Sequence, residues 1–396
     1  MNAQRNVSSL FGAPLAPADR AMFGPEVMDE VRTYMAPLGY ASTPMHSMSS
    51  LARHTGVRQI LVKDERTRST LGSFKALGGA YAVVREVLAL AERALARRLS
   101  PDEINDRDVR AFAAELTITC ATDGNHGRAV ASGARLMGCS AVIFVHEHVS
   151  SARIQAIREL GASVTVVAGS YDDSVAAAKQ AAAEKGWLLV ADTSWPGYEA
   201  LPARVMQGYV LMVHEALQQC EAQALQPTHV FLQAGVGGMA AAVAAYLRIR
   251  FGESAVKVII VEPERAACLY ASACNGTPTR IEAGDSTVMA MLECYEPSLV
   301  AWRILERCAH TFIAIEEEAA VRTLRRLARP LSGDPAVESG ESGGAGLAGL
   351  LEAVAQPELR HALSLDDKSV VLVFNTEGAT DRARYEALLG QEYEAK

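Results

Sequence analysis

The sequence predicts an α/β protein of two lobes, each built on a mostly parallel β-sheet flanked by helices. Short apolar runs rich in β-branched residues alternate with longer helical patterns, and this alternation is typical of parallel sheets covered by helices. A long helical pattern at 203–219 divides the strands into two series. The chain has 396 residues, enough for about two to three domains.

The first series begins with a strand at 59–65, and a long apolar helix at 76–96 follows it. Further strands and helices then alternate. The strands are expected at 116–120, 141–145, 164–167 and 188–190, and the helices at 127–136, 151–160 and 174–184. We therefore expect residues 89–199 to form a small α/β domain, inserted between the two parts of a large domain at 1–88 and 200–396.

The second series predicts the rest of the large lobe. Its strands are expected at 229–233, 258–261, 312–315 and 370–374, and its helices at 239–249, 317–329 and 346–354. Between Ala266 and Ala309 the pattern is mostly helical, and residues 1–30 are expected to be a mobile, weakly amphipathic lead-in. The run Ser100-Pro101-Asp102-Glu103 combines a cap, an initial proline and a capping-box glutamate, so a helix is expected to begin there.

Composition and charge exclude several classes of protein. Hydrophobic residues make up 49% of the chain and charged residues 21%, as in soluble globular proteins. The net charge is −8 and no basic block with interleaved aromatics is present, so nucleic acid is not an expected partner. With no signal pattern and no apolar run near the length of a membrane span, we expect no membrane association and a cytoplasmic location. The seven cysteines lack CxxC spacing and the histidines lack HExxH, which argues against a metal site.

The stretch Leu71-Gly72-Ser73-Phe74-Lys75-Ala76-Leu77-Gly78-Gly79 places one lysine at a strand-to-helix corner. If Ser73 is the N-cap, Lys75 lies in the first helical turn, where the helix dipole and burial both favour a neutral amine. A neutral, desolvated lysine is what Schiff-base chemistry with an aldehyde cofactor requires. Taken alone, a lysine at such a position is more often a solvated helix residue, so the interpretation depends on its neighbours.

The loop Ala121-Thr122-Asp123-Gly124-Asn125-His126-Gly127 follows a buried strand and opens a helix. Its backbone amides would form an anion site at the C-terminal end of a strand, although for the loop taken alone a well-capped βα turn is the more common explanation. Asp123 adds chemical information. A carboxylate beside a bound anion is unfavourable unless a cation lies between them or the carboxylate works as a base.

The loop Gln233-Ala234-Gly235-Val236-Gly237-Gly238-Met239 joins a strand to a helix and is suited to wrap a phosphate at the helix N-terminus. It also fits a dinucleotide fingerprint, in which Glu262 after the next strand would bind a ribose. By itself this loop favours a nicotinamide cofactor. The G-x-S-x-G match at 340–344 lacks the preceding strand of a nucleophile elbow, so we expect an active-site loop that opens a helix there, and no hydrolase.

The run Ser73-Phe74-Lys75-x-Leu77-Gly78-Gly79 resembles the cofactor-lysine motif of the fold type II enzymes that use pyridoxal 5'-phosphate (PLP), and further motifs follow in family order from Thr43 to Asp381. The resemblance implies that Lys75 binds the aldehyde, with Phe74 near the ring edge. It implies that Asn125 contacts the cofactor and Thr376 faces the pyridine nitrogen. The phosphate loop would comprise Gly235, Val236, Gly237, Gly238 and Met239. A dehydrogenase has no use for the lysine corner, so PLP is preferred over a nicotinamide.

Two departures from the usual motifs resemble the diaminopropionate ammonia-lyases within that family. Asp123 replaces the usual serine of the asparagine loop, and Asp192 begins the stretch Asp192-Thr193-Ser194-Trp195-Pro196-Gly197-Tyr198-Glu199. The resemblance implies elimination of ammonia from D- or L-2,3-diaminopropionate to give pyruvate and ammonia. The implied catalytic residues are Lys75, as the base for the L-isomer, Asp123, as the base for the D-isomer, and Asp192, which would bind the β-ammonium. The implied substrate-binding residues are Thr122, Asp123, Gly124, His126 and Asp192.

The same resemblance implies a homodimer and, in some members, a disulfide near the site entrance, for which Cys268 and Cys294 are the candidates. Three alternatives stay open at this point. The chain could be a serine, threonine or hydroxyaspartate dehydratase, a nicotinamide-dependent oxidoreductase, or a non-catalytic PLP-binding relative. Assays of diamino against hydroxy substrates, and the colour of the purified protein, distinguish them.

Overall fold

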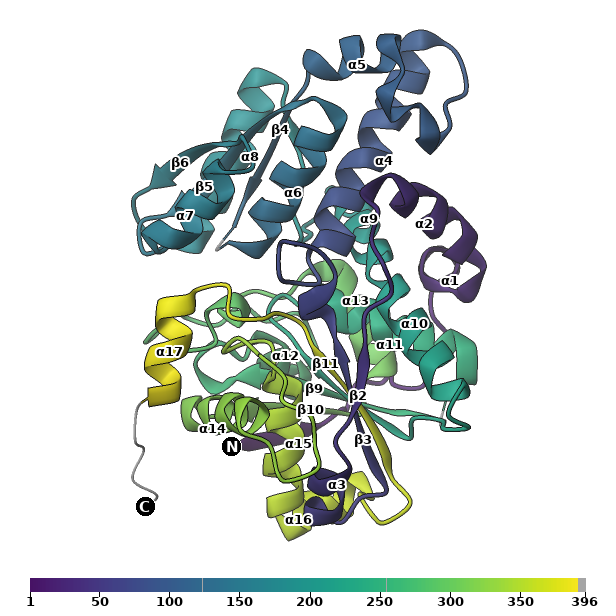
Figure 1. The fold of residues 1–396 in the computed structure, drawn as a ribbon, viewed down its shortest axis with the longest axis vertical. Helices are drawn as coiled ribbons and strands as arrows, with labels where there is room; N and C mark the ends of the chain where they lie inside the picture. The colour runs from purple at the N-terminus through teal and green to yellow at the C-terminus, as the bar shows by residue number, and fades with distance from the viewer. Residues whose placement is uncertain (123, 254, 391–396) are drawn as a thin grey trace. The chain divides into compact units, whose positions relative to one another are not determined.

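The computed structural model describes residues 1–122, 124–253 and 255–390. Packing divides the chain into two compact units (Figure 1). The large unit comprises residues 1–25 and 42–72 and the described residues from 212 onward, and the small unit comprises residues 26–41 and 73–211. The small unit is therefore more extensive than the 89–199 segment that the sequence suggested.

The close packing of α4 (Ala76–Leu95) explains this extension. α4 lies against α6 (Asn125–Met137) and α9 (Ala200–Gly208) of the small unit. The contact with α9 is so close that a Cβ atom on Gly208 would lie 1.8 Å from the carbonyl oxygen of Leu77. No local pattern reports such a contact, so the predicted boundary at 89 divided a helix that packs as one piece.

The large unit contains a seven-stranded sheet in the order β1-β10-β9-β8-β11-β3-β2. The two edge strands β1 and β2 pair antiparallel with their neighbours, and the other pairs are parallel. The strands are β1 (Asn2–Arg5), β2 (Met45–Ser47), β3 (Gln59–Asp64), β8 (His229–Gln233), β9 (Lys257–Pro263), β10 (Thr311–Ile315) and β11 (Val370–Asn375). The parallel strands lie where the sequence predicted them, because their apolar runs are buried in the sheet.

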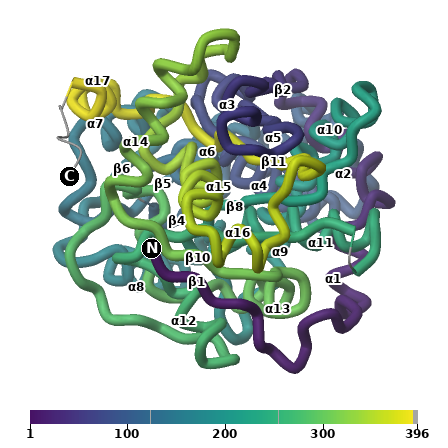
Figure 2. Tube along the Cα trace, turned by 90° about the horizontal axis from the view of Figure 1, so that it is seen from below, coloured from purple at the N-terminus to yellow at the C-terminus, as the bar shows by residue number. Residues whose placement is uncertain are grey.

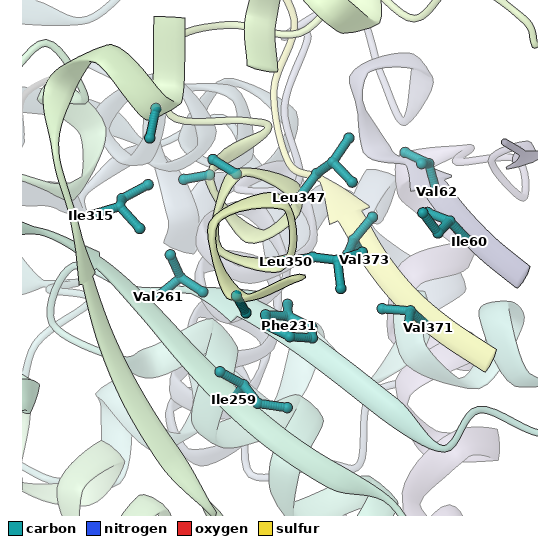
Figure 3. Close-up of a cluster of buried hydrophobic side chains, with 14 of the residues drawn as sticks. Ile60, Val62, Phe231, Ile259, Val261, Ile315, Leu347, Leu350, Val371 and Val373 are labelled. Carbon is teal, nitrogen blue, oxygen red and sulfur yellow. The ribbon is translucent and has the colours of Figure 1, made fainter. Parts of the chain in front are cut away.

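Helices accompany the strands of the large unit. They are α1 (Pro17–Phe23), α3 (Ser49–Thr55), α10 (Val210–Glu221), α11 (Gly238–Phe251), α12 (Cys268–Asn275), α13 (Leu299–Cys308), α14 (Glu317–Ala328), α15 (Ala345–Ala355), α16 (Pro357–Leu363) and α17 (Arg382–Gly390). Figure 3 shows the core beside α15, where Leu347 and Leu350 lie with Val371 and Val373 of β11. This packing places the loop that opens α15 beside the C-terminal end of β11.

The small unit contains a four-stranded parallel sheet in the order β6-β5-β4-β7, as the alternating pattern predicted. The strands are β4 (Thr117–Ala121), β5 (Ser140–His146), β6 (Ser163–Val167) and β7 (Leu188–Leu189). Besides α4, α6 and α9, its helices are α2 (Met28–Met35), α5 (Arg107–Ala114), α7 (Ser151–Arg158) and α8 (Tyr171–Lys185). The predicted start at Ser100 is confirmed as a capping box, although a 3-10 turn at Pro101–Asn105 follows it.

Three local predictions are wrong. Residues 1–30 are ordered rather than a mobile lead-in, because β1 completes the sheet edge beside β10 (Figure 2) and Asp19 pairs with Arg303. The helix predicted at 203–219 is two helices, α9 and α10, which Tyr209 separates. The segment from Ala266 to Ala309 is helical only in α12, α13 and two short 3-10 turns, the first of which ends at Ala266. Among the described helices, none has the length and hydropathy of a membrane span.

Candidate active site

The predicted cofactor lysine lies at the start of α4, in the small unit. Lys75 occupies the N-cap position with helical backbone angles, and its carbonyl oxygen accepts hydrogen bonds from the amides of Gly78 and Gly79, each 3.0 Å away. The prediction that Ser73 caps the helix is wrong, because the helix begins at Ala76. The Ser73 hydroxyl is buried and has no hydrogen-bond partner in the described part of the chain.

The amine of Lys75 is bound by the carboxylate of Asp192, which follows β7. Nζ lies 2.5 Å from Oδ2, and the two side chains are 20% and 13% exposed. Burial alone would raise the pKa of Asp192, but the charge of Lys75 lowers it to about 2. The expected neutral amine is therefore wrong for this structure, because an ionised carboxylate at this distance favours the ammonium form.

His126 lies beside the same carboxylate. Its Nε2 is 2.7 Å from the carbonyl oxygen of Val190, which can only accept, so Nε2 carries the proton. Its Nδ1 is 3.9 Å from Oδ2 of Asp192. Burial lowers the pKa of His126, which favours the neutral ring with a lone pair on Nδ1. The structure thus brings together three of the predicted site residues, Lys75, His126 and Asp192.

The asparagine loop is organised by Thr122. Its Oγ1 accepts hydrogen bonds from the backbone amides of Gly124 and Gly127, each 3.0 Å away. The loop leads directly into α6, which begins at Asn125, and the side chains of Thr122 and Asn125 are buried. Asp123, the predicted base for the D-isomer, lies outside the described residues.

Tyr209 is a site residue that the sequence analysis did not identify. Its ring packs on Phe74 with a centroid distance of 4.8 Å, and the Phe74 ring centroid lies 5.4 Å from the Lys75 amine. A Cβ atom on Gly78 would lie 2.6 Å from the Tyr209 hydroxyl oxygen, so glycine at 78 makes room for the phenol. Burial raises the pKa of Tyr209 to about 12, which keeps the hydroxyl neutral. The only signal in the sequence was the Gly78-Gly79 pair.

The glycine loop in the large unit connects β8 to α11. α11 begins at Gly238, so the loop lies at the N-terminus of a helix of 14 residues, where the first amides lack helical partners. Gly237 has φ +96°, and a Cβ atom there would lie 3.1 Å from side-chain atoms of Ala301 and Leu269. The tight turn therefore needs glycine at 237, as expected of a phosphate cradle.

Glu262 does not have the surroundings that a dinucleotide site requires. It is fully buried, and its two carboxylate oxygens accept hydrogen bonds from the amides of Leu269, at 2.8 Å, and Tyr270, at 2.7 Å. The carboxylate thus caps α12, and both oxygens are occupied by this role. Burial raises the pKa of Glu262 to about 8. The ribose-binding role that the fingerprint suggested for Glu262 is wrong.

Thr376 follows β11 and is 4% exposed. Its Oγ1 lies 2.9 Å from Nε2 of Gln233, the last residue of β8. The G-x-S-x-G stretch lies against the same turn, since the amide of Gly340 donates to the carbonyl oxygen of Glu377 at 3.0 Å. This stretch opens α15, as the sequence predicted, and in the described part of the chain the element before it is the helix α14 and not the strand that a nucleophile elbow requires.

The two cysteines proposed for a disulfide are thiols in the structure. Cys268 is buried at the start of α12, and its Sγ lies 3.8 Å from the carbonyl oxygen of Gly235. Burial raises the pKa of Cys268, and the nearby Cys294 raises it further. A Cβ atom on Gly235 would lie 2.9 Å from Sγ of Cys294, so both cysteines lie at the glycine loop, and their pairing stays a prediction.

Comparison with known proteins agrees with this geometry. The family model described as "Pyridoxal-phosphate dependent enzyme" matches residues 36–377. The chain belongs to this family of PLP enzymes. The match spans the lysine corner, the asparagine loop, the glycine loop and Thr376, which excludes the nicotinamide alternative that the glycine loop had left open.

Two curated relatives define the position of the chain within the family. The diaminopropionate ammonia-lyase of Escherichia coli K12 is 40% identical over 351 residues, covering 88% of this chain and 87% of the relative. The enzyme of the same name from Salmonella typhimurium is 38% identical over 357 residues, 88% of each chain. Within the PLP enzymes, the chain belongs with the diaminopropionate ammonia-lyases.

Solved structures give the same result for the fold. The Escherichia coli diaminopropionate ammonia-lyase in complex with D-serine has a TM-score of 0.88 at 36% identity, covering 98% of this chain and 96% of that one. A processed threonine deaminase from Solanum lycopersicum has a TM-score of 0.67 at 18% identity, covering 93% and 96% of the two chains, and shows the shared fold alone. The predicted fold type II architecture is confirmed.

Proposed function

We propose that the chain eliminates ammonia from 2,3-diaminopropionate with PLP as its cofactor, and that pyruvate and ammonia are the final products. The chain is a carbon–nitrogen lyase by its membership of the ammonia-lyases. The observation that carries the choice of substrate is the ion pair between Lys75 and Asp192, with Nζ 2.5 Å from Oδ2.

That ion pair determines which charge Asp192 lacks once Lys75 has bound the cofactor. Once Lys75 holds the aldehyde carbon of the cofactor, Asp192 loses its cation and remains a mostly buried carboxylate. A buried carboxylate without a partner is unfavourable, so the site gains most from a ligand that brings a second ammonium. The β-ammonium of diaminopropionate supplies that charge. The hydroxyl of serine or threonine does not.

The leaving group supports the same choice. A β-ammonium departs as neutral ammonia when it takes the electron pair of the Cβ–N bond, so it needs no added proton. A hydroxyl must be protonated to leave as water. Diaminopropionate therefore needs no acid from the protein, and its β-ammonium takes the place of the Lys75 charge that holds the pKa of Asp192 low in this structure. The site therefore favours elimination of ammonia over elimination of water.

The predicted site residues of the chain include a partner for each group of PLP. Lys75 would hold the aldehyde carbon, the turn from Gly235 to Met239 would bind the phosphate, and Thr376 would face the ring nitrogen. Asn125 and Phe74 would contact the ring. The cradle at Gly237, which a Cβ atom would fill, supports the phosphate assignment. When bound, PLP supplies the electron sink that makes the Cα proton removable.

Lys75 would take the Cα proton of the L-isomer and Asp123 that of the D-isomer, from opposite faces. His126, with its lone pair on Nδ1 at 3.9 Å from Asp192, would be the second acceptor for the β-ammonium. Thr122 would hold the loop amides in place through its hydroxyl, and Gly124 would help receive the substrate carboxylate. Released 2-aminoacrylate hydrolyses in water to pyruvate and a second ammonia.

The test is a pyruvate-release assay with D- and L-diaminopropionate and D- and L-serine at equal concentrations. A substrate that leaves the Asp192 charge unpaired should lose about 2 to 4 kcal/mol of transition-state stabilisation, or roughly 30- to 1000-fold in kcat/KM. We therefore expect kcat/KM for both diamino isomers to exceed kcat/KM for serine by at least about 30-fold. Faster turnover of serine than of either diamino isomer would favour the dehydratase alternative.

We also propose that the enzyme works as a homodimer in the cytoplasm, as the resemblance to fold type II enzymes implies. Light scattering of the purified protein should give twice the chain mass of 42.2 kDa. A mass of one chain at assay concentration would show that the monomer is the active form.

A further inference from the structure

We infer that Gln233 is a positioning residue, which fixes the hydroxyl of Thr376 so that its proton can be donated only away from the Gln233 amide, toward a ligand. The inference rests on the proposed function in one respect, because the ligand atom in question is the ring nitrogen of the cofactor. Every protein contact that carries it lies in the large unit.

Gln233 and Thr376 follow neighbouring strands. β8 and β11 pair in parallel, so the ends of these strands meet at one edge of the sheet. Gln233 is 2% exposed and Thr376 is 4% exposed. The Gln233 Nε2 atom lies 2.6 Å from the carbonyl oxygen of Gly343, 2.9 Å from that of Phe374 and 2.9 Å from Oγ1 of Thr376.

The two carbonyl oxygens determine which end of the amide points to Thr376. A carbonyl oxygen can only accept, so the atom between them must be the NH₂ group and not the amide oxygen. The NH₂ group has no lone pair to offer. The hydroxyl of Thr376 therefore cannot donate to Gln233, and its oxygen presents a lone pair on that side. The hydroxyl proton is directed elsewhere.

The surroundings hold the amide in this orientation. Gly346, at the start of α15, lies so close that a Cβ atom there would be 2.8 Å from Oε1 of Gln233 and 2.7 Å from the carbonyl oxygen of Phe231. Oε1 itself has no hydrogen-bond partner among the described residues. A buried acceptor without a partner is unfavourable. An apolar side chain at position 233 would leave no acceptor unpaired. We therefore infer that the hydrogen bonds of the NH₂ group compensate for the unpaired Oε1.

The consequence concerns the protonation of the ring nitrogen. A hydroxyl that must donate requires an acceptor, so a ring nitrogen facing Thr376 stays without a proton. An unprotonated ring withdraws electrons more weakly, which favours loss of the β-substituent over proton return to the cofactor. Gln233 would thereby select elimination over transamination without touching the substrate.

The test uses the nearly isosteric substitution Gln233→Glu, together with PLP labelled with ¹⁵N at the ring nitrogen. A buried, protonated glutamic acid can donate to one carbonyl oxygen and still accept from Thr376. The Thr376 hydroxyl could then donate either to residue 233 or to the ring nitrogen. In the wild-type holoenzyme, the ¹⁵N chemical shift should report an unprotonated ring. In Gln233→Glu it should move toward the protonated value, and inactivation by transamination per turnover should rise about tenfold.

Two further variants complete the experiment. Gln233→Met fills a similar volume without hydrogen bonds and should also shift the ¹⁵N signal, so it replaces Gln233→Glu if that protein does not fold. Gln207→Met removes another buried glutamine amide, which bonds Tyr81 and Arg85 in the small unit, and should leave the signal at the wild-type position. An unchanged signal in folded Gln233→Glu or Gln233→Met would overturn the inference. The signal reports the ring whichever amino acid is turned over, so this outcome is separate from failure of the proposed function.

Discussion

Lys75 and Asp192 are separated by 117 positions in the sequence, yet their side chains form an ion pair with Nζ 2.5 Å from Oδ2. The pair joins the residue that would hold the cofactor to the residue that would bind the second ammonium of the substrate. Its partners are mostly buried, so removal of either charge affects the other strongly. Substitution of either residue should therefore change the activity more than substitution in a surface ion pair would.

Asp192→Asn should lower kcat/KM for diaminopropionate about 100-fold or more, because the β-ammonium loses a buried counter-charge. Serine brings no such charge, so its kcat/KM should fall about tenfold or less. The measurement is pyruvate release with both substrates on the same preparation. Equal losses on serine and diaminopropionate would show that Asp192 acts on Lys75 alone and does not bind the leaving group.

Lys75→Ala should abolish the visible absorption that appears when PLP is added to the cofactor-free protein, because the amine that binds the aldehyde is gone. Borohydride reduction followed by mass spectrometry should find no pyridoxyl group on the peptide that contains residue 75. Lys185→Ala, at an exposed lysine of the same unit, is the matched control and should behave as the wild type. Full absorption in Lys75→Ala would end the assignment of Lys75 as the cofactor lysine.

Asp123→Asn should suppress turnover of D-diaminopropionate about 100-fold or more and that of the L-isomer much less, because each isomer presents its Cα proton to a different base. Initial rates with the separate enantiomers check this. Parallel losses on the two isomers would contradict the assignment of two bases and leave one base for both.

Gly208→Ala should destabilise the small unit by about 3 kcal/mol or more, because the added Cβ would lie 1.8 Å from the carbonyl oxygen of Leu77, a backbone atom that cannot move independently. Urea denaturation of the cofactor-free protein measures the effect. Gly284→Ala is the control, since a Cβ there meets nothing within 4 Å and its free energy of unfolding should be unchanged. A stable Gly208→Ala variant would show that α4 and α9 pack less closely than described.

Glu262→Gln should change how stability depends on pH. Burial raises the pKa of Glu262 to about 8 in the folded protein, above the unfolded value of about 4.3. The folded state therefore binds more protons between these values, and this contribution to stability is lost as the pH rises from about 5 through 8, at up to about 1.4 kcal/mol per pH unit. Glu262→Gln has no titrating proton at this position, so its free energy of unfolding should rise relative to that of the wild type over this pH range.

Urea denaturation between pH 5 and about 8.5 checks the prediction for Glu262. The exposed Glu358→Gln is the control and should follow the pH dependence of the wild type. Parallel curves for the wild type and Glu262→Gln would mean that the two backbone donors at Leu269 and Tyr270 keep the carboxylate ionised.

The sequence was sufficient for features that local patterns encode. The strand at 229–233 was predicted at its observed bounds, because an apolar run is followed directly by a glycine turn. The order of strands and helices, the family and the cofactor likewise depend on contiguous motifs. The predicted division of the chain, by contrast, missed the packing of α4 on α9, which depends on a tertiary contact between Leu77 and Gly208.

The parts of the site that the sequence did not predict depend on contacts over long sequence separations. Tyr209 gave no signal beyond the Gly78-Gly79 pair, because its contact with Phe74 exists only after α9 has ended beside α4. Gln233 and Thr376 are 143 positions apart, and only the pairing of β8 with β11 brings them together. The neutral state expected for Lys75 was wrong for the same reason, since the opposing charge of Asp192 is remote in the sequence.

The strand order of the large sheet also determines when the chain can fold as it leaves the ribosome. β3 lies between β2 and β11, so one of its partners is made near the end of translation, on the order of tens of seconds later. Residues 73–211 contain the whole four-stranded sheet in one unbroken stretch and can pack first. The strand Gln59–Asp64, which is mostly buried in the folded protein, therefore lacks one of its two neighbours throughout that interval and is exposed to aggregation in the nascent chain.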